Sequence, residues 1–173
     1  MSLFRRLFGG ANAADDVAGE TESVRRIAAR LERLAPERAR FLAAFAYVLA
    51  RLANVDLRID EAESREMERL VAGAAELGPE EAALAVEIAK SQARLLGGTE
   101  NYVVTREFRR VSTPAERMRL VEALYAVAAA DRWITNAETT EIAAIADELG
   151  LAREDLAAVR ARYRDRIAAL RAR

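Results

Sequence analysis

Cysteine and histidine are both absent from this chain of 173 residues. Their absence excludes disulfide bonds, zinc sites built from the usual sulfur and nitrogen ligands, cysteine nucleophiles and serine–histidine catalysis. An enzyme without these residues would need a metal site made of carboxylates, and no substrate pocket can be inferred from the sequence. We therefore predict that the chain is not an enzyme.

Long apolar runs are also lacking. The most apolar stretch, residues 41–50, is flanked by Arg40 and Arg51 and is shorter than the roughly 18 to 20 residues that span a bilayer. The first ten residues, MSLFRRLFGG, are basic and apolar but lack the long apolar region and cleavage site of a signal peptide. We predict a cytoplasmic protein whose membrane contact is limited to this N-terminal tail or to a membrane-protein partner.

Neither sign of charge dominates the chain. Its 27 basic and 28 acidic residues give a formal net charge of -1. Such a balance provides no broad positive field, so we predict no nucleic-acid partner. Aromatic residues make up only 6% of the chain, whereas hydrophobic residues, many of them alanine, make up 52%. This composition favours closely packed helices.

Helical periodicity begins near residue 22, and no segment alternates convincingly like a strand. Residues 9–21 are small and polar, so we predict a flexible tail over residues 1–21 and one domain over residues 22–173. The fold class is all-α, with about seven to eight helices. The expected helices are 23–34, 37–54, 61–76, 80–96, 101–110, 114–130, 136–149 and 153–171.

Local capping signals support several of these boundaries. Gly78 and Pro79 combine a C-terminal glycine with a first-turn proline. Thr113, Pro114 and Glu116 have the pattern of an N-cap, a first-turn proline and a capping-box glutamate. Two further capping boxes are expected, at Thr135–Glu138 and at Asp60–Glu63.

The pattern D-x-x-I-x-x-x-E occurs twice, 75 positions apart. This spacing predicts two pseudo-repeated helix–loop–helix halves, residues 45–76 and 120–149, within the one domain. The corresponding residues are Asp56 and Asp131, Ile59 and Ile134, and Glu63 and Glu138.

Each acid of the pattern is expected at the end of an apolar stripe, where the two helices of a half meet. Asp56 and Asp131 follow helix C-termini, where the helix dipole disfavours an anion by about 0.3–1 kcal/mol. A divalent cation, an arginine, or hydroxyl and backbone N–H donors would compensate for that cost. Glu63 and Glu138 are explained equally well as capping-box residues. Two interpretations therefore stay open: purely structural roles, or a cation site.

The bound cation, in the second interpretation, would be Ca²⁺, Mg²⁺ or Mn²⁺, because only oxygen ligands are available. The pattern is not an EF-hand, since Arg58 and Glu61 stand where that loop needs an acid or amide and a glycine.

The duplicated motif A-x-x-D-x-x-I-x-x-x-E resembles the TerB tellurite-resistance family and the related domain of DjlA-type DnaJ-like co-chaperones. The likeness covers about residues 36–165. It implies a fold of about seven helices, a cytoplasmic stress-response protein that acts through an unknown protein partner, and no known enzymatic reaction. It also implies divalent-cation binding through the four acids of the motif: Asp56, Glu63, Asp131 and Glu138.

The chain departs from the family's pattern in both halves. Leu57 and Arg132 stand directly after the aspartates, where the family usually has glycine. A tight turn with positive φ would be disfavoured there. The alternative function is a helical interaction module or scaffold that needs no cation.

Overall fold

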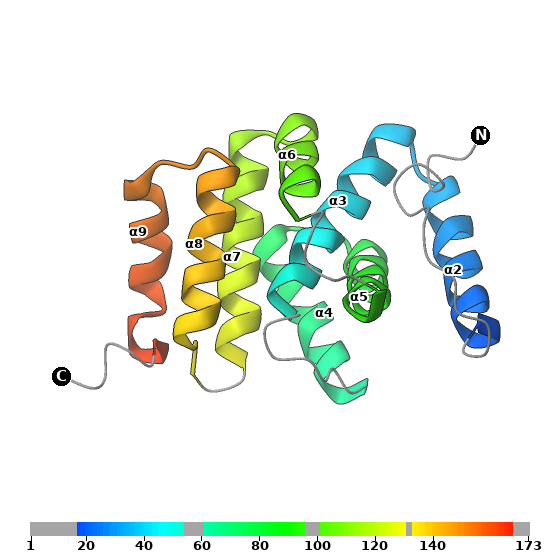
Figure 1. Cartoon of the computed structure of the whole chain (residues 1–173), viewed down its shortest axis with the longest axis horizontal. Helices are drawn as coiled ribbons and strands as arrows, with labels where there is room; N and C mark the ends of the chain where they lie inside the picture. Colours follow the sequence, from blue (N-terminus) through cyan, green and yellow to red (C-terminus); the bar gives the residue numbers. More distant parts are fainter. Residues whose placement is uncertain (1–16, 54–60, 96–100, 131–132, 168–173) are drawn as a thin grey trace.

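The structure of the chain is a computed structural model that describes residues 17–53, 61–95, 101–130 and 133–167 (Figure 1). Within these ranges it is helical and contains no β-strand, which confirms the all-α fold class. The helices are α2 Val17–Glu32, α3 Pro36–Ala53, α4 Glu61–Ala75, α5 Pro79–Leu95, α6 Asn101–Val111, α7 Pro114–Ala130, α8 Asn136–Glu148 and α9 Arg153–Arg162, followed by the short 3-10 helix η1 Arg164–Arg166.

Proline and capping residues set most of the helix starts. Pro36, Pro79 and Pro114 are the first residues of α3, α5 and α7, where a missing backbone N–H costs nothing. At α7, Thr113 Oγ1 accepts from the N–H of Glu116 at 3.2 Å, and Glu116 Oε2 accepts from the N–H of Thr113 at 2.7 Å. The predicted capping box at this position is therefore confirmed.

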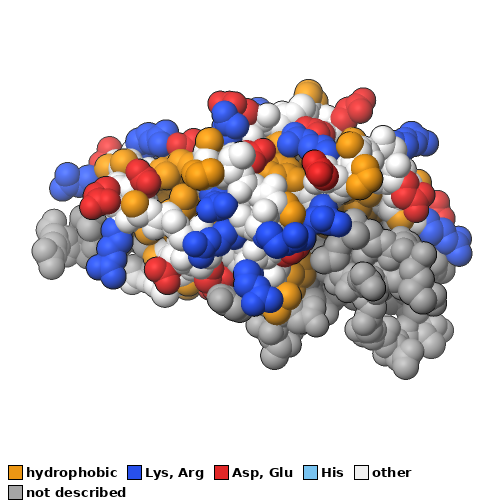
Figure 2. All heavy atoms as spheres, turned by 90° about the horizontal axis from the view of Figure 1, so that it is seen from above, with side chains coloured by type: hydrophobic (Ala, Val, Ile, Leu, Met, Phe, Trp, Pro, Cys, Tyr) orange, Lys and Arg blue, Asp and Glu red, His pale blue; other side chains and the backbone are white. Residues whose placement is uncertain are grey.

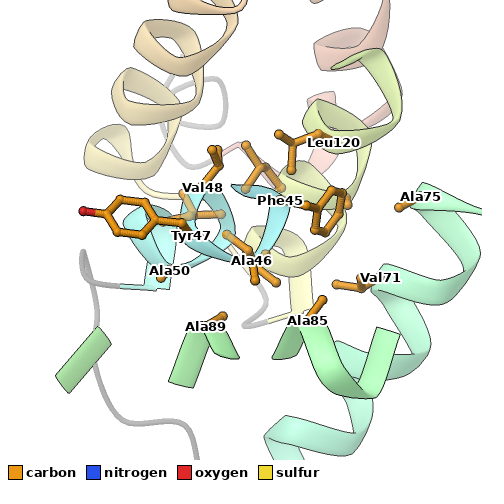
Figure 3. Packing of buried hydrophobic residues seen from close by; sticks show 14 of the residues in the cluster. Phe45, Ala46, Tyr47, Val48, Ala50, Val71, Ala75, Ala85, Ala89 and Leu120 are labelled. Atoms are coloured by element: carbon orange, nitrogen blue, oxygen red, sulfur yellow. The ribbon is translucent and has the colours of Figure 1, made fainter. Parts of the chain in front are cut away.

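Helix α3 lies at the centre of the fold and packs against α5 and α6, while α4 packs against α5 and α7 (Figure 1). Every residue of α3 from Phe41 to Leu52 is buried. Figure 3 shows how Phe45 meets side chains from the other helices, including Val71, Ala85 and Leu120. Helices α7, α8 and α9 lie side by side at one end of the molecule, and α2 lies at the other (Figure 1).

The structure does not confirm the two pseudo-repeated halves. In the second half, α7 packs along its successor α8. In the first half, α4 packs mainly against α5 and α7 instead of its predecessor α3. Both α4 and α8 are followed by a residue of positive φ, Glu76 with 53° and Gly150 with 70°, so the helix ends do not distinguish the two halves. Asp56 and Asp131 lie outside the described residues, so their predicted equivalence stays a prediction.

Two predicted boundaries need correction. Helix α2 begins at Val17 instead of residue 23, while the division into a tail and one domain stays a prediction. It is anchored by buried Ile27 and by Arg30, whose guanidinium donates to Glu87 of α5 at 2.9 Å. A docked helix extends readily over flanking residues, because propagation costs less than nucleation.

The last predicted helix, 153–171, ends instead at Arg162. The chain then leaves the helical path, and Ile167 becomes extended and fully buried. The N–H of Ile134 donates to the carbonyl oxygen of Arg166 at 2.8 Å. This isolated bridge between Ile134 and Ile167 is a tertiary contact, which the helical periodicity of the C-terminal segment did not indicate.

Gly150 closes α8 in a way that predicts the effect of a small substitution. The N–H of Gly150 donates to Asp147 and that of Leu151 to Ala146, which is the Schellman arrangement. A Cβ on Gly150 would lie 2.8 Å from the guanidinium carbon of Arg109. We expect Gly150→Ala to lower the free energy of unfolding in urea by about 1–2 kcal/mol, because alanine is unfavourable at this positive φ. The Arg109 guanidinium, at the end of a flexible side chain, can move aside at little cost.

The same substitution at Gly73 is the control. Gly73 lies inside α4, and a Cβ there meets nothing within 4 Å. We expect Gly73→Ala to raise the free energy of unfolding by about 0.5–1 kcal/mol, since alanine is the better helix former. Equal effects at the two glycines would contradict the different backbone conformations described for them.

Candidate functional site

The second copy of the acidic motif is held by a capping box at the start of α8. Thr135 is the N-cap, with φ -73° and ψ 166°. Its Oγ1 accepts from the N–H of Glu138 at 3.2 Å, and Glu138 Oε2 accepts from the N–H of Thr135 at 2.8 Å. The Thr135 hydroxyl also contacts Glu138 Oε2 at 2.8 Å. The capping role predicted for Glu138 is confirmed.

The two carboxylate oxygens of Glu138 are used differently. The N–H and the hydroxyl of Thr135 both donate to Oε2, and within the described ranges no donor reaches Oε1. The residue as a whole is only 7% exposed. The capping box thus fixes a buried carboxylate while leaving one oxygen for another ligand, so capping and cation binding are compatible.

The residues before the cap are fixed by core packing. Ile134 is fully buried, and its N–H is bound to Arg166. Trp133 is half-buried. The isoleucine of the motif is therefore a core residue, as expected, and it fixes the chain directly before the N-cap Thr135.

The structure places only part of the predicted metal site. Asp56 and Asp131 lie outside the described ranges, and so does the side chain of Glu63, although its backbone lies in the first turn of α4. Glu138 is the one predicted ligand whose surroundings are described. In the part of the chain that the structure covers, no three acidic side chains gather as a metal-ligand set. Cation binding through these four acids accordingly stays a prediction.

A lysine distinguishes the surroundings of the first motif. Lys90, the only lysine of the chain, donates from Nζ to Ser64 Oγ at 2.7 Å, in the first turn of α4 directly after Glu63. A helix N-terminus disfavours a cation, so this ammonium group needs negative charge near it. At the corresponding position of the second half, Thr139 Oγ1 instead donates to the carbonyl oxygen of Thr135 at 2.8 Å. The second motif is therefore the better candidate for an added cation.

Comparison with known families shows to which family the chain belongs. The family model described as Tellurite resistance protein TerB matches residues 41–161, which is more than half of the chain. The chain belongs to the TerB family. The TerB match begins in α3, ends in α9 and includes both acidic motifs. Neither the curated proteins nor the solved structures gave a match.

No TerB-family helix in the described ranges combines the length and the apolar character needed to cross a membrane. The longest apolar run of the sequence, residues 41–50, lies in the buried part of α3.

A buried ion-pair network within the TerB region was not predicted from the sequence. The side chain of Arg51, in the last turn of α3, is only 5% exposed. Its guanidinium donates to Glu141 at 2.9 Å, to Glu148 at 2.7 Å and to Thr105 Oγ1 at 2.7 Å. These partners come from α8 and α6, so one arginine ties three helices together.

The charge of Arg51 is secured by these contacts. Burial acts to lower the pKa of the guanidinium, but hydrogen bonds to Glu148 and Glu141 outweigh it and leave the pKa raised. Arg51 thus stays protonated throughout the usual pH range. The two glutamates face it from one side of α8, two helical turns apart, and are partly open to solvent.

Proposed function

We propose that this TerB-family protein is a non-enzymatic, cytoplasmic stress-response protein that works by binding other proteins. We further propose that a divalent cation, Ca²⁺, Mg²⁺ or Mn²⁺, binds at the second acidic motif with Glu138 and Asp131 among its ligands. The observation that carries the cation proposal is the different use of the two carboxylate oxygens of Glu138. Oε2 caps α8, while Oε1 accepts no hydrogen bond from the described residues.

Family membership supports the stress-response assignment at the level of tellurite resistance. The chemistry of the motif supports a hard cation, because carboxylate oxygens are the ligands that Ca²⁺, Mg²⁺ and Mn²⁺ prefer. A buried, preorganised carboxylate also loses little conformational entropy when it binds an ion. In the first motif, the ammonium group of Lys90 beside Ser64 would compete with such an ion.

The second candidate is an interaction module that needs no cation. One observation favours it: the capping box alone gives Glu138 a complete structural role. The two candidates differ in one measurable property. A cation that binds only the native state stabilises it, by about 2.7 kcal/mol at a concentration one hundred times the dissociation constant.

Substitutions in the second motif test the proposal. We expect Asp131→Asn and Glu138→Gln each to weaken cation binding at least tenfold, because each removes a negative charge while keeping the size of the side chain. Glutamine can still accept from the N–H of Thr135, so the cap of α8 should be retained. Binding is measured by the fluorescence of Trp133, the only tryptophan, and by the shift of the melting temperature.

Glu116→Gln is the matched control. Glu116 forms the same capping box with Thr113, with nearly the same distances, but outside the acidic motif. It should leave cation affinity unchanged. If millimolar Ca²⁺, Mg²⁺ and Mn²⁺ change neither the Trp133 emission nor the melting temperature of the unmodified protein, the cation site is ruled out. The interaction module is then the function that stays.

A further inference from the structure

Helix α6 presents a face that consists mainly of arginine. Arg106, Arg109, Arg110 and Val103 are all exposed and fall on one side of the helix at 100° per residue. The opposite side, with Val104, Thr105 and Phe108, is buried. Val103 is 56% exposed and is the one large hydrophobic residue so exposed among the described residues. We call these four exposed residues the arginine face.

The positive charge of the arginine face is only partly neutralised. Arg110 pairs with Glu107 at 2.8 Å, and Arg40 of α3 lies 4.0 Å from the same carboxylate. The hydrogen bond from Arg110 holds the pKa of Glu107 below its ordinary value, so this glutamate is already committed. Arg106 lies close enough to Glu107 to help lower its pKa, and the guanidinium of Arg109 lies beside Gly150 at the end of α8. Within the described ranges neither group forms a hydrogen bond or a close ion pair.

Helix capping does not account for these arginines. Cations at a helix C-terminus interact favourably with its dipole, and Arg109 and Arg110 lie in the last turn of α6. However, Arg117 of α7 already donates to the carbonyl oxygens of Arg109 and Ser112, at 2.7 and 2.9 Å. The end of α6 is therefore satisfied by another residue. The guanidinium group of Arg106 and the outer side of that of Arg109, which lies beside Gly150, stay available to a ligand.

The chemistry of this face fits an acidic helix better than a nucleic acid. Arginine is weakly hydrated, binds carboxylates with two parallel hydrogen bonds, and is enriched at protein interfaces. The face is short, since a helix of 11 residues is about 16 Å long. Val103 adds an apolar contact that phosphates would not use.

The whole molecule has no comparable excess of positive charge. The net charge of the molecule is -1. In the view from above, several basic side chains lie in the middle of the visible surface, with acidic side chains around them (Figure 2). A local group of arginines on a near-neutral protein favours a small acidic partner over a long polyanion.

We propose that the arginine face of α6 is a docking surface for an acidic amphipathic helix of a partner protein, with carboxylates three or four residues apart around a central apolar residue. The proposal rests on the partner-binding part of the proposed function and not on its cation. It names the chemistry of the partner: glutamates opposite Arg106 and Arg109, and an aliphatic side chain on Val103.

The test uses a fluorescein-labelled synthetic helix with glutamates three and four residues apart around one leucine, and a second peptide with glutamine in their place. Binding to the full chain is followed by fluorescence anisotropy in EDTA, so that failure of the cation site cannot affect the result. We expect saturable binding of the glutamate peptide, at least tenfold weaker binding of the glutamine peptide, and a marked loss of affinity as salt concentration rises.

Variants of the protein locate the site. The double variant Arg106→Gln, Arg109→Gln should bind the glutamate peptide at least tenfold more weakly, and Val103→Ser should weaken binding several-fold. The control is Arg25→Gln with Arg65→Gln, which removes the same charge from exposed positions on α2 and α4 and should change affinity less than twofold. Circular dichroism checks that all variants keep their helical content.

Three results would overturn the proposal. They are no saturable binding of the glutamate peptide, equal binding by the two peptides, or equal losses in the two double variants. A single-stranded DNA oligomer that binds more tightly than the glutamate peptide and loses affinity in Arg106→Gln, Arg109→Gln would instead assign the face to nucleic acid. None of these outcomes depends on whether a cation binds at Glu138.

Discussion

Replacing Arg51 by alanine is expected to lower the free energy of unfolding by about 3 kcal/mol, because removing one member of a buried ion pair leaves its partners without compensation. The loss is at the lower end of the range for buried pairs, since Glu141 and Glu148 are partly open to water and can be rehydrated. For a chain of this size the melting temperature should fall by roughly 6–12 °C. Chemical and thermal denaturation measure the effect.

Three further variants separate charge from packing at Arg51. Arg51→Lys keeps the charge but loses the planar fork, so it should cost less than alanine while still destabilising. Arg51→Met combined with Glu148→Gln should be more stable than Arg51→Met alone, because less uncompensated charge is left. Arg69→Ala is the exposed comparison: Arg69 pairs with Glu66 on the surface of α4, and its loss should cost less than about 0.5 kcal/mol. A loss at Arg51 as small as that at Arg69 would disprove the role given to the network.

Phe108→Ala is expected to be the most destabilising single change, at about 3–5 kcal/mol. Phe108 is fully buried, and its ring lies 5.3 Å from that of Phe41 and 6.1 Å from that of Phe45. These contacts hold α6 against α3. Alanine would leave a cavity in a position where neither helix can close up easily, since α3 is buried on every side from Phe41 to Leu52.

Urea denaturation checks the effect of Phe108, with Val103→Ala as the comparison on the other side of the same helix. Val103 is exposed, so its truncation should change stability by less than about 0.5 kcal/mol. Similar losses at both positions would show that α6 is not oriented as described. The buried side of α6 sets the orientation of its exposed side, so a change at Phe108 can also affect peptide binding to the arginine face. Phe108→Leu, whose side chain fills most of the volume of the phenylalanine ring, is the variant in which that effect should be measured.

The boundaries of α3 to α8 could be predicted from the sequence to within about one residue because local groups set them. Pro79 and Pro114 begin helices, and the Thr135–Glu138 capping box begins α8. Such signals act through the nearest few residues and do not depend on the rest of the fold. The end of α9 depends on Ile167 meeting Ile134, a contact between distant parts of the chain, and it was predicted wrongly.

At the candidate site too, local features could be predicted from the sequence, and contacts between distant segments could not. The capping role of Glu138 is local and is confirmed by the structure. The network around Arg51 needs α3, α6 and α8 to meet, so its partners could not be predicted. A signal for it was present, however: residues 41–50 form an apolar run with no polar face, so the arginine that follows at its end would be enclosed and would need acids.

The bridge between Ile134 and Ile167 also gives the second motif a mechanical connection. The backbone hydrogen bond from Ile134 to Arg166 joins the C-terminal side of η1 to the residue directly before the N-cap of α8. Tension applied to the chain at Ile167 therefore acts on the start of α8 as well as on α9. A force there would reach the capping box of Glu138, and with it the carboxylate proposed to bind a cation, through one hydrogen bond and one buried side chain.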